Sequence, residues 1–525
     1  MLTFHGPAPL GRFYGPVAQS SRMKYAFGGG VEYALDTHWS TRFEYLFVNQ
    51  ALGNQVYDNG LGFQLGAHEQ NEAHLLRFGL NYRFSDNNAA QDEKTGESKA
   101  NDAEPNQTKP AGPEQYSVHA QVTNVAQGYP KFPALYDGPN SFRSKGQARD
   151  GSTADGFFGA RLWSGGEAYV NPEIDQGFGL SNSVGAAAYV NGAVAKFGRS
   201  APYLRFQRYF LRQTIGLGGE SEAVEGGLNQ LAGSVDSNRL TFTVGKFGVP
   251  DIFDDNKYAH DATNTFLNFA INTMGAFDYA ADSWGYTYGA AMEWKQESWT
   301  ARAGVFQLSD IPNSQKIEPV LLRQFMPIFE IEKRYELFDQ PGKIKFLAFG
   351  DRGYISKIDD VINFAFATRF FPPDINNMRK LQFKAGVGVN IEQQLTPTLG
   401  FFLRASMADG RFETVDYTDI DRSISAGFSL SGQSWDRPND TIGAAVAASG
   451  LSNSRIRYFG LGGTSVYIGD GALSYGGEQV FETFYKYNVM DGVQVTVDYQ
   501  FLHNPAHNLD RGPISVFALR LHGEF

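Results

Sequence analysis

Three arginines stand close together in the run YLRFQRYFLRQ, and side chains of this kind can bind hydroxyl-rich solutes. A guanidinium group donates several hydrogen bonds in a fixed geometry and stays charged at any relevant pH. Arg205, Arg208 and Arg212 are spaced three and four residues apart, which does not fit one face of a regular strand. We expect at least two of them on one face, and all three only if the strand contains a β-bulge.

A second group of candidate residues occupies the segment WSGGEAYVNPEID. A sugar presents hydroxyl edges and C–H faces together, so its site needs hydrogen-bonding groups beside an aromatic ring. The segment provides both kinds of side chain in Trp163, Glu167, Tyr169, Asn171, Glu173 and Asp175. In the alternative interpretation, Trp163 is a residue of the membrane interface and the acids belong to a solvated loop.

Acidic residues elsewhere are candidates to face the arginines across a pore. We expect this of Asp278, in GAFDYAAD, and of Glu293, on the polar face of residues 286–294.

Evidence for a metal, a cofactor or catalysis is weak. The segment DIFDDN is rich in oxygen ligands, but it lacks the spacing of a twelve-residue calcium loop, so we expect no metal. The nine histidines form no HExxH arrangement, and neither GxSxG nor a phosphate-binding glycine loop is present. With no cysteine, thiol chemistry and disulfides are also excluded. We therefore expect neither an enzyme nor a cofactor.

The composition suits a membrane β-barrel better than a helical membrane protein. Glycine, phenylalanine and tyrosine are abundant, at 59, 43 and 26 residues, while the mean hydropathy is −0.34. No run reaches the roughly 18 apolar residues of a spanning helix. Barrel strands alternate lipid-facing and water-facing side chains, which gives a mildly polar average. The net charge of −11 disfavours nucleic acid and anionic lipid head groups as partners.

Alternation with period two runs through most of the chain. In residues 381–391 the apolar positions Leu381, Phe383, Val387 and Ile391 oppose polar ones such as Lys384. From Tyr116 onward we count roughly 15 or 16 such runs, and the even number of bacterial barrels favours 16. A soluble sandwich also alternates, but here the second face carries charges on strand after strand. We therefore predict an all-β fold, a transmembrane antiparallel β-barrel over residues 116–525.

Residues 1–115 differ from this pattern. Residues 85–115 contain no aromatic or large aliphatic side chain, which predicts a flexible linker. Residues 1–84 contain three amphipathic strands, a number that cannot close a barrel. Residues 1–10 lack the basic start and apolar core of an export signal, so we expect the true start to be missing or removed.

The final run, VFALRLHGEF, alternates and ends on Phe525. It resembles the carboxy-terminal signature by which the barrel-assembly machinery binds outer-membrane proteins. GLNYRF, ending at Phe84, has the same form. Residues 24–84, with FGGGVEYALDTHWSTRFEYLF and LLRFGLNYRF, resemble the last three strands of small eight-stranded outer-membrane surface proteins. We expect this section to be a remnant that is poorly ordered or packs in another way.

Residues 116–525 resemble the carbohydrate-selective porins of the OprB type. The matching stretches include RLWSGGEAYVNPEIDQGFGLSNSVGAAAYVNG, RYFLRQTIGLGGE, VGKFGVPDIFDDNKYAHDATNTFLNFAI and NPAHNLDRGPISVFALRLHGEF. The resemblance implies a sixteen-stranded barrel in the bacterial outer membrane, surrounded by its lipids, with inward-folded loops that narrow the pore. It implies passive diffusion of monosaccharides and similar solutes. Porins often trimerise, which makes a homotrimer the oligomer to test.

Two other functions remain open at this point. One is a general or structural outer-membrane barrel without sugar selectivity. The other is a secreted all-β protein that binds glycans or acts on them.

Overall fold

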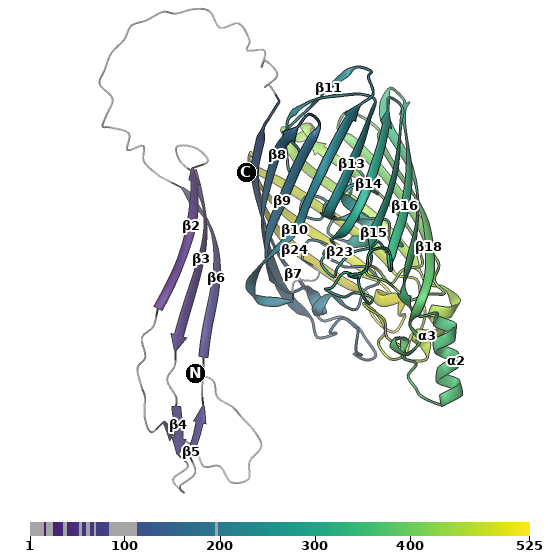
Figure 1. Ribbon diagram of the computed structural model, residues 1–525. Coiled ribbons are helices and arrows are strands. Elements are labelled where there is room, and N and C mark those ends of the chain that lie inside the picture. Colours follow the sequence, from purple (N-terminus) through teal and green to yellow (C-terminus); the bar gives the residue numbers. More distant parts are fainter. Residues whose placement is uncertain are drawn as a thin grey trace, which may run out of the picture. The chain divides into compact units, whose positions relative to one another are not determined.

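The computed structural model describes residues 113–194 and 198–525 and, before residue 113, six strands. The chain forms two compact units, residues 1–106 and 107–525. Three long strands of the first unit pair in the order β2-β3-β6 (Figure 1). Their bounds are β2 (Tyr25–Ala34), β3 (Trp39–Ala51) and β6 (Gln70–Tyr82); β1 (Gly15–Pro16), β4 (Gln55–Asp58) and β5 (Gln64–Ala67) form a second sheet. The predicted linker lies outside the described residues except for its last three.

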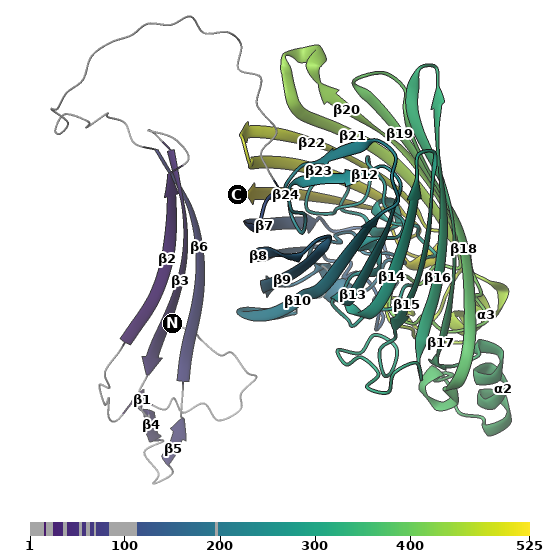
Figure 2. The same cartoon turned by 45° about the horizontal axis from the view of Figure 1, so that its top comes forward.

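The second unit is a closed barrel of 16 antiparallel strands, which confirms the predicted fold and strand number (Figure 2). Its strands are β7 (Tyr116–Tyr129), β8 (Gln147–Trp163), β9 (Gly166–Gly177), β10 (Arg199–Gly216), β13 (Arg239–Phe247), β14 (Thr287–Gln296), β15 (Trp299–Gln307), β16 (Phe325–Leu337), β17 (Gln340–Ile355), β18 (Lys380–Gln394), β19 (Leu399–Ala408), β20 (Arg422–Gly432), β21 (Arg437–Gly450), β22 (Gln479–Met490), β23 (Val493–His503) and β24 (Ile514–Glu524).

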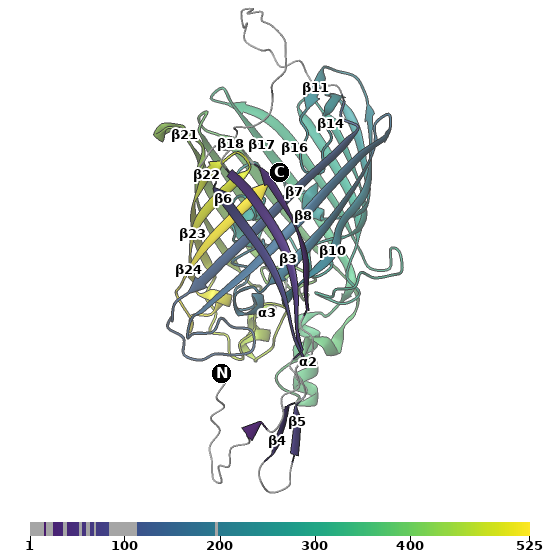
Figure 3. The ribbon, with the colours of Figure 1, turned by 90° about the vertical axis from the view of Figure 1, so that its left-hand side faces the viewer.

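The barrel closes where β24 pairs with β7 (Figure 3). Beyond the strand itself, Phe525 exchanges two backbone hydrogen bonds with Ala120, at 2.8 and 2.9 Å. Closure pairs every strand on both sides, which is the arrangement that lipid requires of β-structure.

The strands separate a lipid-facing surface from the lumen as the alternation predicts. On β18, Leu381, Phe383 and Val387 are exposed on the outside, while Lys384 and Asn390 are buried inside. Apolar side chains therefore face the lipid, and the charged ones face the interior.

The two ends of the barrel differ in their connections (Figure 1). Most connections at one end are tight turns, such as residues 164–165 and 491–492, whereas long loops connect the strands at the other. Outer-membrane barrels have short periplasmic turns and longer extracellular loops, so the end with the tight turns faces the periplasm. The connection between β10 and β13 differs from its neighbours because it contains a hairpin, β11 (Ser221–Val224) and β12 (Gly233–Asp236).

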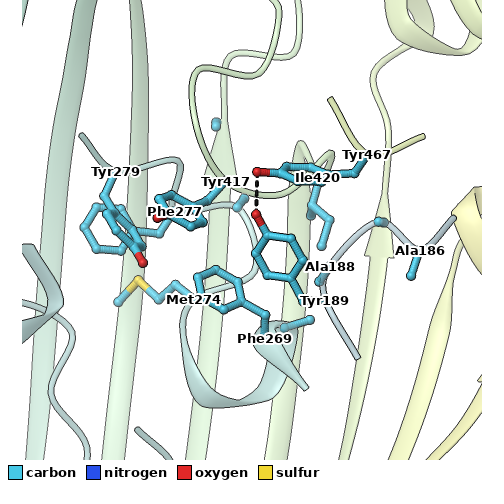
Figure 4. Packing of buried hydrophobic residues seen from close by; sticks show 14 of the residues in the cluster. Ala186, Ala188, Tyr189, Phe269, Met274, Phe277, Tyr279, Tyr417, Ile420 and Tyr467 are labelled. Atoms are coloured by element: carbon cyan, nitrogen blue, oxygen red, sulfur yellow. Dashed lines mark hydrogen bonds between the residues drawn. The ribbon is translucent and has the colours of Figure 1, made fainter. Parts of the chain in front are cut away.

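The long loops fold into the barrel and form its core (Figure 4). Tyr189, Phe269, Tyr279 and Tyr417 come from three different loops and pack ring against ring, with Tyr279 and Tyr417 stacked at 4.3 Å. The long loops carry the helices α1 (Phe269–Asn272), α2 (Ile358–Thr368) and α3 (Asn453–Gly460) and four short 3-10 turns, η1 (Leu180–Ser183), η2 (Val249–Asp251), η3 (Ile375–Met378) and η5 (Pro505–His507); η4 (Gln433–Trp435) lies in the periplasmic turn between β20 and β21. Within the described part of the chain, no helix is both long and apolar enough to cross a bilayer.

Candidate functional site

Two cavities lie in the lumen and meet at a shared ring of side chains. The first, of about 610 Å³, is lined by inward loops and the middle of β8 to β10, and we call it the outer cavity. The second, of about 400 Å³, is lined by strand ends next to the periplasmic turns, and we call it the inner cavity. Five residues line both, namely Arg212, Gln230, Asp251, Ile252 and Asp255. These five residues, which we call the shared ring, mark the level at which one cavity leads into the other.

A β-bulge in β10 brings the three arginines into the lumen. The pairing of β10 with β9 shifts by one residue between Phe206 and Arg208. Gln207 is consequently buried, Phe206 points outward and is exposed, and Arg208 turns inward. Without this extra residue, the odd spacing from Arg205 to Arg208 would place one of the two in lipid.

Arg208 is held in place by the loop between β13 and β14. Its Nε and Nη2 atoms donate to the two carboxylate oxygens of Asp251, both at 2.7 Å, and its guanidinium lies over the Tyr286 ring at 4.8 Å. Burial alone would raise the pKa of Asp251, but the Arg208 charge outweighs burial and keeps that pKa below its usual range. The pair is therefore charged, bidentate and fixed at the shared ring.

The other two arginines are also paired. The guanidinium of Arg205 stacks 3.2 Å over the Trp284 ring and donates to Asp282 at 3.3 Å. Arg212 donates to the backbone oxygen of Asn229 at 3.0 Å and lies 4.0 Å from Glu167. Each arginine thus keeps a fixed orientation while its charge is largely offset by a carboxylate.

Strand β9 places the acids of WSGGEAYVNPEID on the lumen side. Glu167, Asn171, Glu173 and Asp175 occupy alternate positions and are all buried. Glu173 lines the outer cavity and accepts a hydrogen bond from Gln207 at 3.1 Å, whereas Glu167 lines the inner cavity. These residues form the wall beside the arginines.

Trp163 does not belong to this site. Its side chain is 56% exposed at the periplasmic end of β8, lines neither cavity, and donates to Gln213 at 2.7 Å. The β8–β9 register shifts between Arg161 and Trp163, which interrupts the alternation just before the turn. The structure supports the alternative interpretation, in which Trp163 lies at the membrane interface.

Asp278 is a structural residue and does not face the arginines. It is 2% exposed and accepts from the N–H groups of Val415, Asp416 and Tyr417 at 2.6 to 2.9 Å. Lys384 on β18 donates to the same carboxylate at 2.7 Å. Asp278 therefore lines neither cavity, and its carboxylate holds two loops together.

Glu293 does reach the lumen, at the inner cavity, where it accepts a hydrogen bond from Arg302 at 2.9 Å.

In the segment DIFDDN, Asp254 accepts hydrogen bonds from Arg404 at 2.9 Å and from the Met274 N–H at 2.7 Å. Among residues 113–194 and 198–525, no group of three or more acidic or histidine side chains is arranged to hold a metal ion.

The sequence did not indicate several residues of the lumen, above all Trp284 and Tyr286 in the loop of residues 248–286 and Gln230 in the periplasmic hairpin. No local pattern marks them, because their positions depend on how an entire loop folds back. One feature of the sequence could have pointed to Gln230. The segment from residue 217 to residue 238 is unusually long for a periplasmic turn.

Comparison with known proteins gives one family and several related structures. The model of the carbohydrate-selective porin, OprB family, matches residues 140–525. No curated protein shows a significant match.

Among solved structures, the high-pH structure of Pseudomonas putida OprB shares the fold. It has a TM-score of 0.59 and 16% identity, and the match covers 78% of this chain and 94% of that one. The low-pH structure of the same protein has a TM-score of 0.43 and 13% identity, covering 78% and 93% of the two chains. The outer membrane channel DcaP of Acinetobacter baumannii has a TM-score of 0.42 and 11% identity, covering 79% and 99%.

Proposed function

Because the chain belongs to the carbohydrate-selective porin family of the OprB type, we propose that monosaccharides and similar small solutes cross it past the three arginines of β10. The protein is an outer-membrane porin of a Gram-negative bacterium and not an enzyme. The observation that carries the proposal is the Arg208–Asp251 pair at the shared ring.

Paired charges favour a neutral, hydroxyl-rich solute over an ion. Arg205, Arg208 and Arg212 each have a carboxylate within 4.0 Å, so they offer directed hydrogen bonds with little net charge. An anion approaching Arg208 would meet Asp251 at the same place. A sugar hydroxyl, in contrast, can accept a hydrogen bond from Arg208 and donate one to Asp251.

Aromatic rings beside these pairs suit the C–H faces of a sugar ring. Trp284 and Tyr286 line the outer cavity, where each stacks with an arginine. The volumes of the two cavities fall within or near the roughly 300–1,000 Å³ of ordinary small-molecule sites, so a monosaccharide fits. The arginines and aromatic rings lie at several positions along the pore. A solute can therefore bind weakly at each position and move on to the next.

Transport by proteoliposomes tests the proposal. We expect faster swelling with glucose than with an amino acid of similar size, and glucose should reduce single-channel conductance. Arg208→Ala should reduce the glucose preference, while the exposed Arg411, which lines neither cavity, provides the matched control Arg411→Ala. Equal swelling rates for the two solutes would contradict sugar selectivity.

We further propose that β24, ending at Phe525, is the segment bound by the barrel-assembly machinery, and that the barrel assembles as a homotrimer in outer-membrane lipid. Apolar and polar side chains alternate along this strand. Phe517, Leu519 and Leu521 are exposed on the lipid-facing side, whereas Arg520 and His522 are buried. Removing Phe525 should lower the yield of heat-modifiable barrel in outer membranes, and cross-linking of purified protein should give a three-chain band.

A further inference from the structure

The periplasmic hairpin between β10 and β13 reaches into the pore. Its strands β11 and β12 pair from Ser221 with Asp236 to Val224 with Gly233 (Figure 2). The connecting residues 225–232, which we call the tip, line the lumen with Leu228, Asn229, Gln230 and Leu231. This segment therefore enters from the side opposite to the long loops.

The tip is a tight turn with a defined conformation. Gly227 and Gln230 exchange two backbone hydrogen bonds, at 2.9 and 3.1 Å, and Asn229 between them has a φ of 55°. Left-handed backbone of this kind favours asparagine and glycine. The residues at the end of the turn are thus presented in one geometry.

The tip is attached to the barrel wall beside the arginines. The backbone oxygen of Asn229 accepts from Arg212 at 3.0 Å, and the N–H of Leu231 donates to the Tyr169 hydroxyl at 3.3 Å. The Leu231 side chain is 1% exposed and belongs to the hydrophobic core. A loop in free solution would not bury a leucine, so the tip is part of the packed interior.

Gln230 lies where the two cavities join. It belongs to the shared ring with Arg212 from the wall and with Asp251, Ile252 and Asp255 from the loop of residues 248–286. That loop enters from the extracellular end, so the ring is built by two segments inserted from opposite ends. A solute that moves from one cavity to the other therefore passes Gln230 and Asp251 at the same level.

Glu114, which lies just before β7, forms hydrogen bonds with the last residue of the tip, Ala232. The Glu114 N–H donates to the Ala232 oxygen at 2.9 Å, and the Ala232 N–H donates to the Glu114 carboxylate at 2.8 Å. Arg161 donates to the backbone oxygens of both residues, at 3.1 Å to Glu114 and 3.4 Å to Ala232. The position of the tip therefore depends on the segment by which the chain enters the barrel.

We propose that the tip is a second selectivity element of the pore, with Gln230 contacting the passing solute and Glu114 acting as a positioning residue for the tip. The inference rests on the proposed sugar transport, since it concerns the same path. It adds a periplasmic contribution to a constriction otherwise formed by the wall and the extracellular loop.

Single-channel recording with glucose as the blocking solute tests Gln230. We expect Gln230→Ala to raise ion conductance and weaken the glucose block, each by about twofold or more, because side-chain volume and a hydrogen-bonding amide are lost at the shared ring. A hairpin in which two glycines replace residues 225–232 should raise conductance further. Gln433 is the matched control, since it is exposed in another periplasmic turn and lines neither cavity.

The role of Glu114 requires a variant pair, because a simple loss of function could reflect misfolding. Glu114→Ala removes the acceptor for the Ala232 N–H and should increase current fluctuations between open levels. Glu114→Gln keeps an acceptor oxygen and should restore the steady current. Heat-modifiable migration in detergent gels checks that all variants form the barrel.

The outcomes separate the two proposals. If the wild-type channel passes glucose but Gln230→Ala and the shortened hairpin retain its conductance and block, the role of the tip is overturned. If the wild-type channel shows no response to glucose, sugar transport fails, while higher conductance in the shortened hairpin still supports the tip as part of the constriction.

Discussion

Arg404 on β19 and Asp254 on the inward loop form an ion pair at 2.9 Å, and both side chains are 1% exposed. The same carboxylate accepts from the Met274 N–H and from Asn390, and the guanidinium also donates to the Ile271 oxygen. All these partners come from the loop of residues 248–286 or from the facing wall. The pair therefore fixes the loop of residues 248–286 to the barrel wall.

Replacing Arg404 with alanine should destabilise the folded barrel strongly. A buried carboxylate left without its cation costs about 3–5 kcal/mol. Arg411→Ala, which breaks an ion pair with a largely exposed arginine, should leave the free energy of unfolding nearly unchanged, because solvent screens such a pair. Urea unfolding in detergent or lipid, followed by the heat-modifiable gel shift, measures both. Equal losses in the two variants would contradict the role assigned to the buried pair.

Arg208→Lys should weaken the glucose block although the charge is kept. Lysine cannot reproduce the two parallel hydrogen bonds to Asp251 or lie flat over the Tyr286 ring. We expect a loss on the order of 1 kcal/mol, a factor of about five in affinity. Glucose titration of single-channel current gives the value, and an unchanged affinity would mean that charge alone matters at this position.

The two tryptophans Trp163 and Trp284 should differ in their effects. Trp284→Ala removes the ring under Arg205 in the outer cavity and should reduce the glucose block several-fold. Trp163→Ala, at the periplasmic rim, should leave the block unchanged and only lower the efficiency of membrane insertion. A loss of block with Trp163→Ala would restore the original expectation for that residue.

Protonation of the extracellular loops should make their stability depend on pH. Burial raises the pKa of Glu478 to about 7, although its carboxylate accepts from the N–H groups of Ala187 and Ala506. The folded state then holds a proton that the unfolded state, with a pKa near 4.5, has released. Stability from this group is therefore greatest in acid and falls as pH rises through 7, by up to about 3 kcal/mol.

Protonation of His507 changes the stability of the folded state in the opposite direction from protonation of Glu478. Burial lowers its pKa to about 4, and its Nδ1 accepts from the Glu478 N–H at 3.1 Å. Stability from His507 is thus lost as pH falls from about 6.5 towards 4. Thermal unfolding of wild type and Glu478→Gln separates the two groups. The variant should lose the decline in stability that accompanies a rise from pH 4.5 to about 7, and keep the loss that accompanies a fall from pH 6.5 to about 4.

Much of the barrel could be predicted because lipid imposes a local rule on each strand. The alternation around Leu381 and Phe383 is visible in the sequence, and so is the need for a bulge between Arg205 and Arg208. The inward loops follow no such rule. Asp278 contacts Val415, 137 residues away, and Gln230 reaches the lumen only because a whole hairpin folds inward. The side of a strand on which a residue lies can therefore be predicted from the local pattern, whereas the position of a loop residue cannot.

The ion pairs that attach the inward loops to the wall have a consequence for the kinetics of transport. Asp254 with Arg404, Asp278 with Lys384, and Asp421 with Arg455 hold the lumen in shape before a solute arrives. No loop has to unfold or rotate for each molecule that crosses. Flux should then increase with temperature about as steeply as diffusion in water does, and its direction should follow the concentration gradient alone.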